Sequence, residues 1–180
     1  RHSIMVALIA ESIGRHCKRY ETIDEQELFS AAVLHDIGKL ALAVHEPSSL
    51  AKTLHRCIGE DVPFYGAEPE AMSHRAVGVE LALHWRLPSE IAGPIAHHHA
   101  PECAKNHARI VAVVHVSDIM AHLMGYPTFE TEITPPLSDK ALAAINLPLE
   151  RLRIIAETEI EHLSRIEVSC GIQGAEANAR

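Results

Sequence analysis

The chain has 180 residues, which is the size of one ordinary domain and enough to bury a core without disulfides or a structural metal. Apolar residues make up 47% of it and aromatic residues only 4%, so the core must be aliphatic, as in helical bundles, and we predict an all-α fold. The formal net charge is -8 and the 16 Lys and Arg are scattered, which excludes the basic stripe of a protein that binds nucleic acid.

The cysteines and the hydropathy of the chain indicate the cellular compartment in which the protein is expected. The four cysteines stand far apart, with no CxxC pair and no preceding signal peptide, and we predict that all are buried free thiols in a reducing cytosol: Cys17, Cys57, Cys103 and Cys170. No apolar run approaches the roughly 18 residues of a membrane span, and no targeting segment is recognisable. We therefore expect a cytoplasmic protein with no membrane partner.

The first half of the chain predicts four helices. Apolar residues recur at helical spacing over residues 2–20. Residues 22–25 (TIDE) fit a capping box for a second helix, which runs from about residue 24 to residue 35 or beyond. A proline opens a third helix over 47–60, and another proline, after the loop DVPFYGAEPE, opens a fourth helix over 69–85.

The second half continues this pattern. A short fifth helix begins at residues 87–89 and must end at Pro101. Residues 105–124 are strongly helical, and GYP stops that helix at the start of a loop over 125–137. The last clear helix, over residues 148–168, is amphipathic, and the tail GIQGAEANAR should fray.

Histidine is the residue type in excess: there are fourteen, including an internal triplet that is not a purification tag. A His or Asp on the apolar side of a helix costs several kcal/mol unless something pairs with it, so helical phase selects the candidates. His97 falls on a polar face with Glu90. Core-facing positions, together with the aspartate that follows His35, hold seven candidate metal ligands: His2, His35, Asp36, His74, His98, His99 and Asp118.

The seven candidate ligands allow two interpretations. Any one histidine is more often a satisfied core or surface residue than a ligand. One shared metal cluster, however, explains the burial of all seven at once, and we predict such a cluster. Because a candidate ligand is the second residue of the chain, we also expect the natural protein to continue upstream of residue 1. We divide the chain into a core over 1–124, the loop over 125–137, and C-terminal helices with a tail over 138–180.

The spacing of these residues carries a family resemblance. His2, the pair His35-Asp36 and Asp118 match the H…HD…D signature of the HD superfamily of metal phosphohydrolases. His74 and the pair His98-His99 match the extra ligands of its two-metal members. The stretches LHDIGKL, SHRAVGVELALHWRLPSEI and IAHHHAP resemble the HDOD family, in which a W-x-L-P turn follows the third histidine. The resemblance covers about residues 2–124 and implies an HD-domain helical bundle with a central metal site.

The resemblance also implies how the ligands are shared between two divalent ions. One ion would take His2, His35, Asp36 and Asp118. The other would take His74, His98 and His99, with Asp36 as a bridge. A mixed imidazole and carboxylate shell suits Fe, Mn, Zn, Co or Ni better than Mg or Ca.

The chain is similar to HD-GYP phosphodiesterases as well. In that family the GYP triplet follows the histidine pair closely, whereas Gly125-Tyr126-Pro127 comes after Asp118 in the predicted loop. We interpret this triplet as a coincidence, which argues against cyclic di-GMP as the substrate.

Two functions from different classes fit the resemblance. The first is a phosphohydrolase or phosphodiesterase acting on a nucleotide-type substrate, because two ions activate a shared water and clamp phosphoryl oxygens. Asp36 and Lys39 would be its catalytic residues, with Lys39 neutralising phosphoryl charge; a cation at a helix C-terminus is the other interpretation of Lys39. The second is a regulatory HDOD module, in which bound metal or nucleotide sets a conformation that partner domains or proteins detect.

The remaining histidines receive no ligand role. His115 and His122 lie a turn before and after Asp118 and could orient ligands, but we expect them at the surface. Polar faces or loops hold the others: His16, His45, His55, His84, His107 and His162.

Overall fold

The computed structural model describes residues 1–17 and 24–171, and over these residues it is helical with no strand, which confirms the all-α prediction. Ten α-helices and two 3-10 turns follow one another along the described chain: α1 (His2–Cys17), α2 (Glu25–Leu34), α3 (Ile37–His45), α4 (Pro47–Glu60), α5 (Phe64–Ala67), η1 (Glu70–Met72), α6 (His74–His84), α7 (Ser89–His97), η2 (Pro101–Cys103), α8 (Ala108–Leu123), α9 (Asp139–Ile145) and α10 (Leu149–Ser169).

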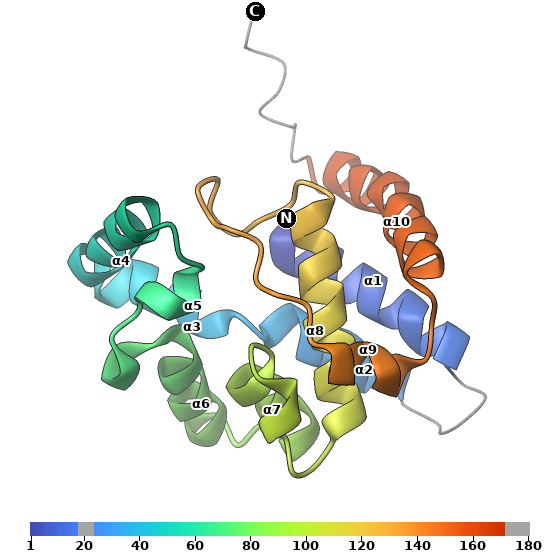
Figure 1. The fold of residues 1–180 in the computed structure, drawn as a ribbon, viewed down its shortest axis with the longest axis horizontal. Coiled ribbons are helices and arrows are strands. Elements are labelled where there is room, and N and C mark those ends of the chain that lie inside the picture. Colours follow the sequence, from blue (N-terminus) through green and yellow to red (C-terminus); the bar gives the residue numbers. More distant parts are fainter. Residues whose placement is uncertain (18–23, 172–180) are drawn as a thin grey trace, which may run out of the picture.

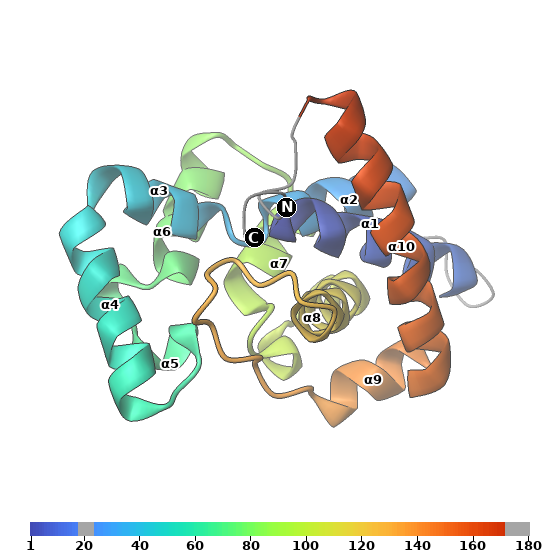
Figure 2. The ribbon, with the colours of Figure 1, turned by 90° about the horizontal axis from the view of Figure 1, so that it is seen from above.

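Helix α8 is the central element of the bundle, with α1, α9 and α10 around it and α7 beside it (Figures 1 and 2). Every residue from Ile110 to His122 is buried, which is expected of a helix that is apolar on all sides. The main core lies between α1, α2, α8 and α10. A smaller core of Cys57, Phe64 and Ala67 lies between α4 and α5. Helices α3 to α6 form the other end of the molecule.

The second helix has nearly the predicted bounds, and a turn separates it from a further helix, α3, that the sequence analysis did not distinguish. Asp24, rather than the predicted Thr22, caps α2, because its carboxylate accepts hydrogen bonds from the amides of Gln26 and Glu27. Thr22 itself lies outside the described residues. Helix α2 ends at Leu34, and Asp36 adopts φ -104° and ψ 16° before α3 begins. The break falls at the His-Asp pair, where it matters for the candidate site.

Other boundaries differ more locally from the sequence predictions. The predicted loop DVPFYGAEPE contains α5, because Phe64 inserts its ring into the smaller core. The predicted fourth helix begins late: Pro69 opens only η1, and α6 starts at His74, where the Ser73 hydroxyl caps it by accepting from the amide of Ala76. The predicted tail lies mostly outside the described residues.

Two predictions from composition need correction. Cys17 and Cys57 are buried, but Cys103 and Cys170 are exposed, because they lie at the ends of η2 and α10. The segment Glu25–His45 is long and apolar enough to cross a membrane, although the sequence analysis expected no such run. It consists of two helices joined at a turn, and 44% of its apolar window is buried inside the bundle, so its length and composition are weak evidence for a membrane span.

Candidate metal centre

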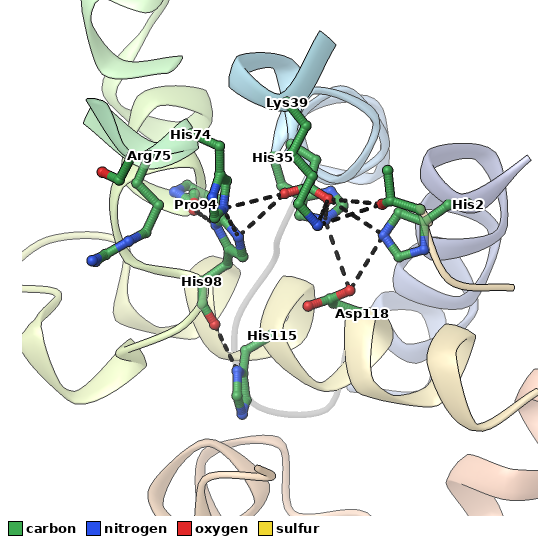
Figure 3. Close-up of polar contacts among 12 residues, drawn as sticks. His2, His35, Lys39, His74, Arg75, Pro94, His98, His115 and Asp118 are labelled. Carbon is green, nitrogen blue, oxygen red and sulfur yellow. Dashed lines mark hydrogen bonds and ion pairs between the residues drawn. The ribbon is translucent and has the colours of Figure 1, made fainter. Parts of the chain in front are cut away.

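The break between α2 and α3 lets two neighbouring residues face one point. In a continuous helix, adjacent side chains diverge by about 100°. Here His35 and Asp36 form the turn between the two helices, and both side chains are buried. Figure 3 shows His35 facing other candidate ligands, among them His2 and Asp118. Gly38 then lets α3 lie against α6, since a Cβ at this position would stand 1.8 Å from the carbonyl oxygen of His74.

All seven candidate ligands converge in this region as two adjacent groups. Within each group, one potential ligand atom from every residue lies within 4.8 Å of the others. We call His2, His35 and Asp118 the first group. The second group comprises Asp36, His74, His98 and His99. His97, which the sequence analysis set aside, belongs to neither group.

Asp36 contacts imidazoles of both groups. Its Oδ1 is 3.4 Å from Nε2 of His74 and 3.5 Å from Nε2 of His98. Its Oδ2 is 3.6 Å from Nε2 of His2 and 3.5 Å from Nε2 of His35. One carboxylate oxygen therefore faces each group, which is the arrangement that a bridging ligand requires.

Four of the imidazoles are each held by a hydrogen bond from Nδ1, so that Nε2 faces the centre. His2, His35 and His98 donate to backbone carbonyl oxygens, those of Tyr126, Ala32 and Pro94, at 2.6, 2.7 and 2.9 Å. His74 donates to the Glu68 carboxylate at 2.6 Å. A proton fixed on Nδ1 leaves the lone pair of Nε2 free, and Nε2 is the atom that faces the centre in each case.

Glu68 is a functional residue that the sequence analysis missed. One of its oxygens receives the Nδ1–H of His74, and the other receives the backbone N–H of His74 at 2.6 Å. This carboxylate thus caps α6 and orients a candidate ligand at the same time. Glu68 lies in an extended loop, where helical phase gives no information, so the sequence offered no signal for it.

Burial and neighbouring charges set the protonation of the centre. Burial lowers the pKa of His35 to about 4, so this imidazole is neutral and able to bind a cation. Burial also lowers the pKa of His99 well below its ordinary value. Burial alone would raise the pKa of Asp36, but the charge of Lys39 and the nearby imidazoles hold it well below the usual range. His35 and His99 therefore present neutral imidazoles, and Asp36 presents an ionised carboxylate.

Lys39 is buried beside the centre and lies in the first turn of α3, so its interpretation as a cation at a helix C-terminus is wrong. Its Nζ lies 2.8 Å from Oδ2 of Asp36 and 2.6 Å from Oε1 of Glu132. Although burial lowers the pKa of Lys39, these two carboxylates raise it above its ordinary value. Glu132, in the loop after α8, is a second residue that helical phase could not identify.

The histidines on either side of Asp118 are buried, and the prediction that they lie at the surface is wrong. Helix α8 is enclosed on all sides, so it has no solvent face on which they could lie. His115 donates from Nδ1 to the carbonyl oxygen of His98 at 2.6 Å. His122 has Nδ1 3.1 Å from Oδ1 of Asp118. Burial lowers the pKa of His122, but contacts with Asp118 and Glu132 outweigh it and raise the pKa to about 10.

The residues present fit divalent metal ions. Within the described chain, several buried ligand atoms lack a hydrogen-bond partner: Nε2 of His2 and His35, Oδ1 of Asp36 and Asp118, and both ring nitrogens of His99. Each such atom costs about 1–3 kcal/mol if it stays unpaired. The nearby carboxylates outnumber the cationic side chains, and a cation at each group would pair these atoms and offset the negative charge.

Comparison with known proteins identifies the family of this chain. The family model for the HDOD domain matches residues 1–101. The chain belongs to the HDOD family. The match spans α1 to α7 and includes every candidate ligand except Asp118, so this HDOD chain places its last candidate ligand beyond the matched residues.

Two solved structures are similar to this HDOD chain. The first is an HDOD domain protein of unknown function from Geobacter sulfurreducens, with a TM-score of 0.70 and 25% identity over 93% of this chain. The second, from Shewanella amazonensis SB2B, is provisionally named a phosphohydrolase and has a TM-score of 0.62 and 22% identity over 88% of this chain. The chain spans 59% and 58% of these two proteins. No curated protein matches the sequence.

Proposed function

We propose that this HDOD domain is a metal-dependent phosphohydrolase or phosphodiesterase with a two-metal centre and a nucleotide-type substrate. The observation that carries the proposal is the position of Asp36, which presents one carboxylate oxygen to each group of imidazoles. Two such groups about one carboxylate are an arrangement for two neighbouring ions, and neighbouring ions suit phosphoester hydrolysis.

The proposed ligands follow the two groups. His2, His35 and Asp118 would hold one ion; His74, His98 and His99 would hold the other; Asp36 would bridge them. The mixed donor set suits Fe, Mn, Zn, Co or Ni. When bound, two ions of this kind lower the pKa of a shared water and stabilise charge on phosphoryl oxygens.

The chain's own residues would orient the substrate and balance its charge. Lys39 would neutralise negative charge on the phosphoryl group, since its ammonium lies within 2.8 Å of the bridging carboxylate. Glu68 fixes the orientation of the His74 ring, and Asp36 contacts imidazoles of both groups. The surrounding helices exclude bulk water, which strengthens each of these interactions.

The test is hydrolysis of a generic phosphodiester, bis(p-nitrophenyl) phosphate, by protein loaded with Mn²⁺ or Fe²⁺. We expect turnover by the natural sequence and none by Asp36→Ala. Asp61→Asn is the matched control, because Asp61 is an exposed aspartate whose left-handed backbone, φ 53°, also accommodates asparagine. Equal turnover by Asp36→Ala and Asp61→Asn would exclude the proposed centre as the source of the activity.

A regulatory module is the second candidate function, and one observation favours it. The loop after α8 lies against the centre, and the carboxylate of its Glu132 forms an ion pair with Lys39 at 2.6 Å. Lys39 is therefore already paired within the chain. In such a module, bound metal or nucleotide would act through partner domains rather than through turnover. Metal binding without hydrolysis of any member of a nucleotide panel would favour this candidate. For either function we propose a cytoplasmic setting, on the basis of four free cysteines.

A further inference from the structure

The segment between α8 and α9, residues 125–137, which we call the strap, runs from α8 toward α5 and returns to α9 (Figures 1 and 2). It is fixed at its two ends. The carbonyl oxygen of Tyr126 accepts from His2, and just beyond the strap the backbone N–H of Ser138 donates to Nε2 of His115 at 2.9 Å. Between these anchors the strap has no helix or strand.

The middle of the strap places the carboxylate of Glu132 between two cationic side chains beside the centre, Lys39 and His122. The Glu132 side chain is only 2% exposed. Its Oε1 lies 2.6 Å from Nζ of Lys39, and its Oε2 lies 3.6 Å from Nε2 of His122. The first distance is that of a hydrogen bond, and the second is that of an ion pair only. Both cationic side chains also contact a candidate ligand, because Lys39 lies 2.8 Å from Asp36 and His122 lies 3.1 Å from Asp118.

Few contacts hold this carboxylate apart from the two cationic side chains. Within the described residues, the strap itself contributes the N–H of Phe129, at 3.4 Å from Oε2, and the backbone bond from Glu132 N to Phe129 O. Thr128 lies alongside, with its hydroxyl donating to Oδ2 of Asp36 at 3.2 Å. The Phe129 ring also packs against Phe64, with centroids 5.3 Å apart, so a movement that withdraws Glu132 is expected in the residues after Phe129, with Thr128 and both anchors in place.

We propose that Lys39, His122 and the hydroxyl of Thr128 form a phosphoryl-binding subsite, and that Glu132 is its resident occupant, displaced when a phosphoester or inorganic phosphate binds. A carboxylate and a phosphoryl group both present paired oxygen acceptors to lysine and imidazole donors. A phosphate carries more negative charge than a carboxylate, so the same donors favour it. The inference rests on the proposed function only in assigning phosphoryl chemistry to this centre.

The first test is binding of inorganic phosphate to Mn²⁺-loaded protein, measured by isothermal titration calorimetry. We expect Glu132→Gln to bind phosphate about ten-fold more tightly than the natural sequence, because a competing, like-charged group has been removed. Glu130→Gln removes the same charge from an exposed position in the strap and should leave the affinity unchanged. Equal or weaker binding by a folded Glu132→Gln variant, judged by its thermal melting, would overturn the proposal.

A second measurement uses the natural sequence alone. Saturating phosphate should raise the hydrogen-exchange rate of strap amides several-fold, with Phe129 among them, because Glu132 leaves its position. Unchanged exchange with phosphate bound would overturn the proposal. Neither measurement requires turnover. Tighter phosphate binding by Glu132→Gln without any hydrolysis would keep the subsite and remove the proposed activity, whereas hydrolysis with unaltered phosphate affinity would do the reverse.

Discussion

The two groups of candidate ligands differ in what holds them in place. The first group, His2, His35 and Asp118, comes from three helices that enclose the main apolar core, and all three residues are buried. The second group lies directly beside the first and is placed by a few specific contacts. These are the Glu68 hydrogen bond to His74, the close approach at Gly38, and a ring stacked on the half-buried His99.

This difference implies unequal sensitivity to mutation. Backbone carbonyl oxygens orient the rings of His2 and His35, and apolar packing spread over many residues holds the helices around them. No single side chain therefore positions the first group as a whole. The second group depends on identifiable atoms, so single substitutions should loosen it without disturbing the first. Asp36 is the exception, because it faces both groups and its loss should affect them together.

The largest effect is expected from Asp36→Ala. Loss of a partner behind a ligand costs about 10- to 100-fold in metal affinity, and loss of a shared ligand should cost about 100-fold or more at both groups. Mn²⁺ titration with elemental analysis should show two ions in the natural sequence and neither retained by the variant at micromolar metal. His35→Ala and His98→Ala, one from each group, should each lose a single ion. Retention of one ion by Asp36→Ala would show that Asp36 is not a bridge.

Gly38→Ala should have the next largest effect, on folding as well as on the second group. The new Cβ would stand 1.8 Å from the His74 carbonyl oxygen, and a backbone atom cannot move aside as a side chain can. We expect a loss of about 3 kcal/mol in the free energy of unfolding, measured by denaturant titration without metal. Gly59→Ala is the control, because nothing lies within 4 Å of the added Cβ and the change should stabilise α4 by about 0.5–1 kcal/mol. Equal stabilities would contradict the close approach of α3 and α6.

The same contrast explains how much of the molecule sequence reasoning could predict. Helical phase reports on the buried side of a helix, so it placed His2, His74 and Asp118 correctly toward the interior. It failed for His115 and His122, because α8 is buried on every side and its polar residues have no outward face. Helical phase distinguishes buried from exposed positions only when one face of the helix is exposed to solvent.

Loops limited the prediction of the site. Glu68 and Glu132 act from extended segments, where no periodicity relates a residue to the core. Their positions follow from tertiary packing: Phe64 lies 5.3 Å from Phe129, ring centre to ring centre, which brings the strap against α5. The break at the His-Asp pair was equally hidden, since the apolar pattern continues across it and favours one helix.

Glu68→Gln sharpens the comparison because it tests one contact of the second group. The amide cannot hold the Nδ1–H of His74 as a carboxylate does, so we expect about 10- to 100-fold weaker binding of one ion and no change in the other. Competition with a fluorescent Mn²⁺ chelator would measure both affinities. Glu70→Gln, at an exposed glutamate in the neighbouring 3-10 turn, should change neither. A loss at both ions would place Glu68 in a general structural role.

The smallest effect is expected at Tyr65, whose ring stacks on His99 with centroids 4.4 Å apart and planes 23° apart. Both ring nitrogens of His99 lack a hydrogen-bond partner within the described residues, so ring contacts must set the orientation of this ligand. A stacked pair contributes about 0.5–1.5 kcal/mol, so Tyr65→Leu should weaken only the second-group ion, by about two- to ten-fold in the same chelator competition. Tyr65→Phe keeps the ring and should bind as the natural sequence does. If phenylalanine and leucine weakened binding equally, the hydroxyl rather than the stacked ring would be the feature that matters.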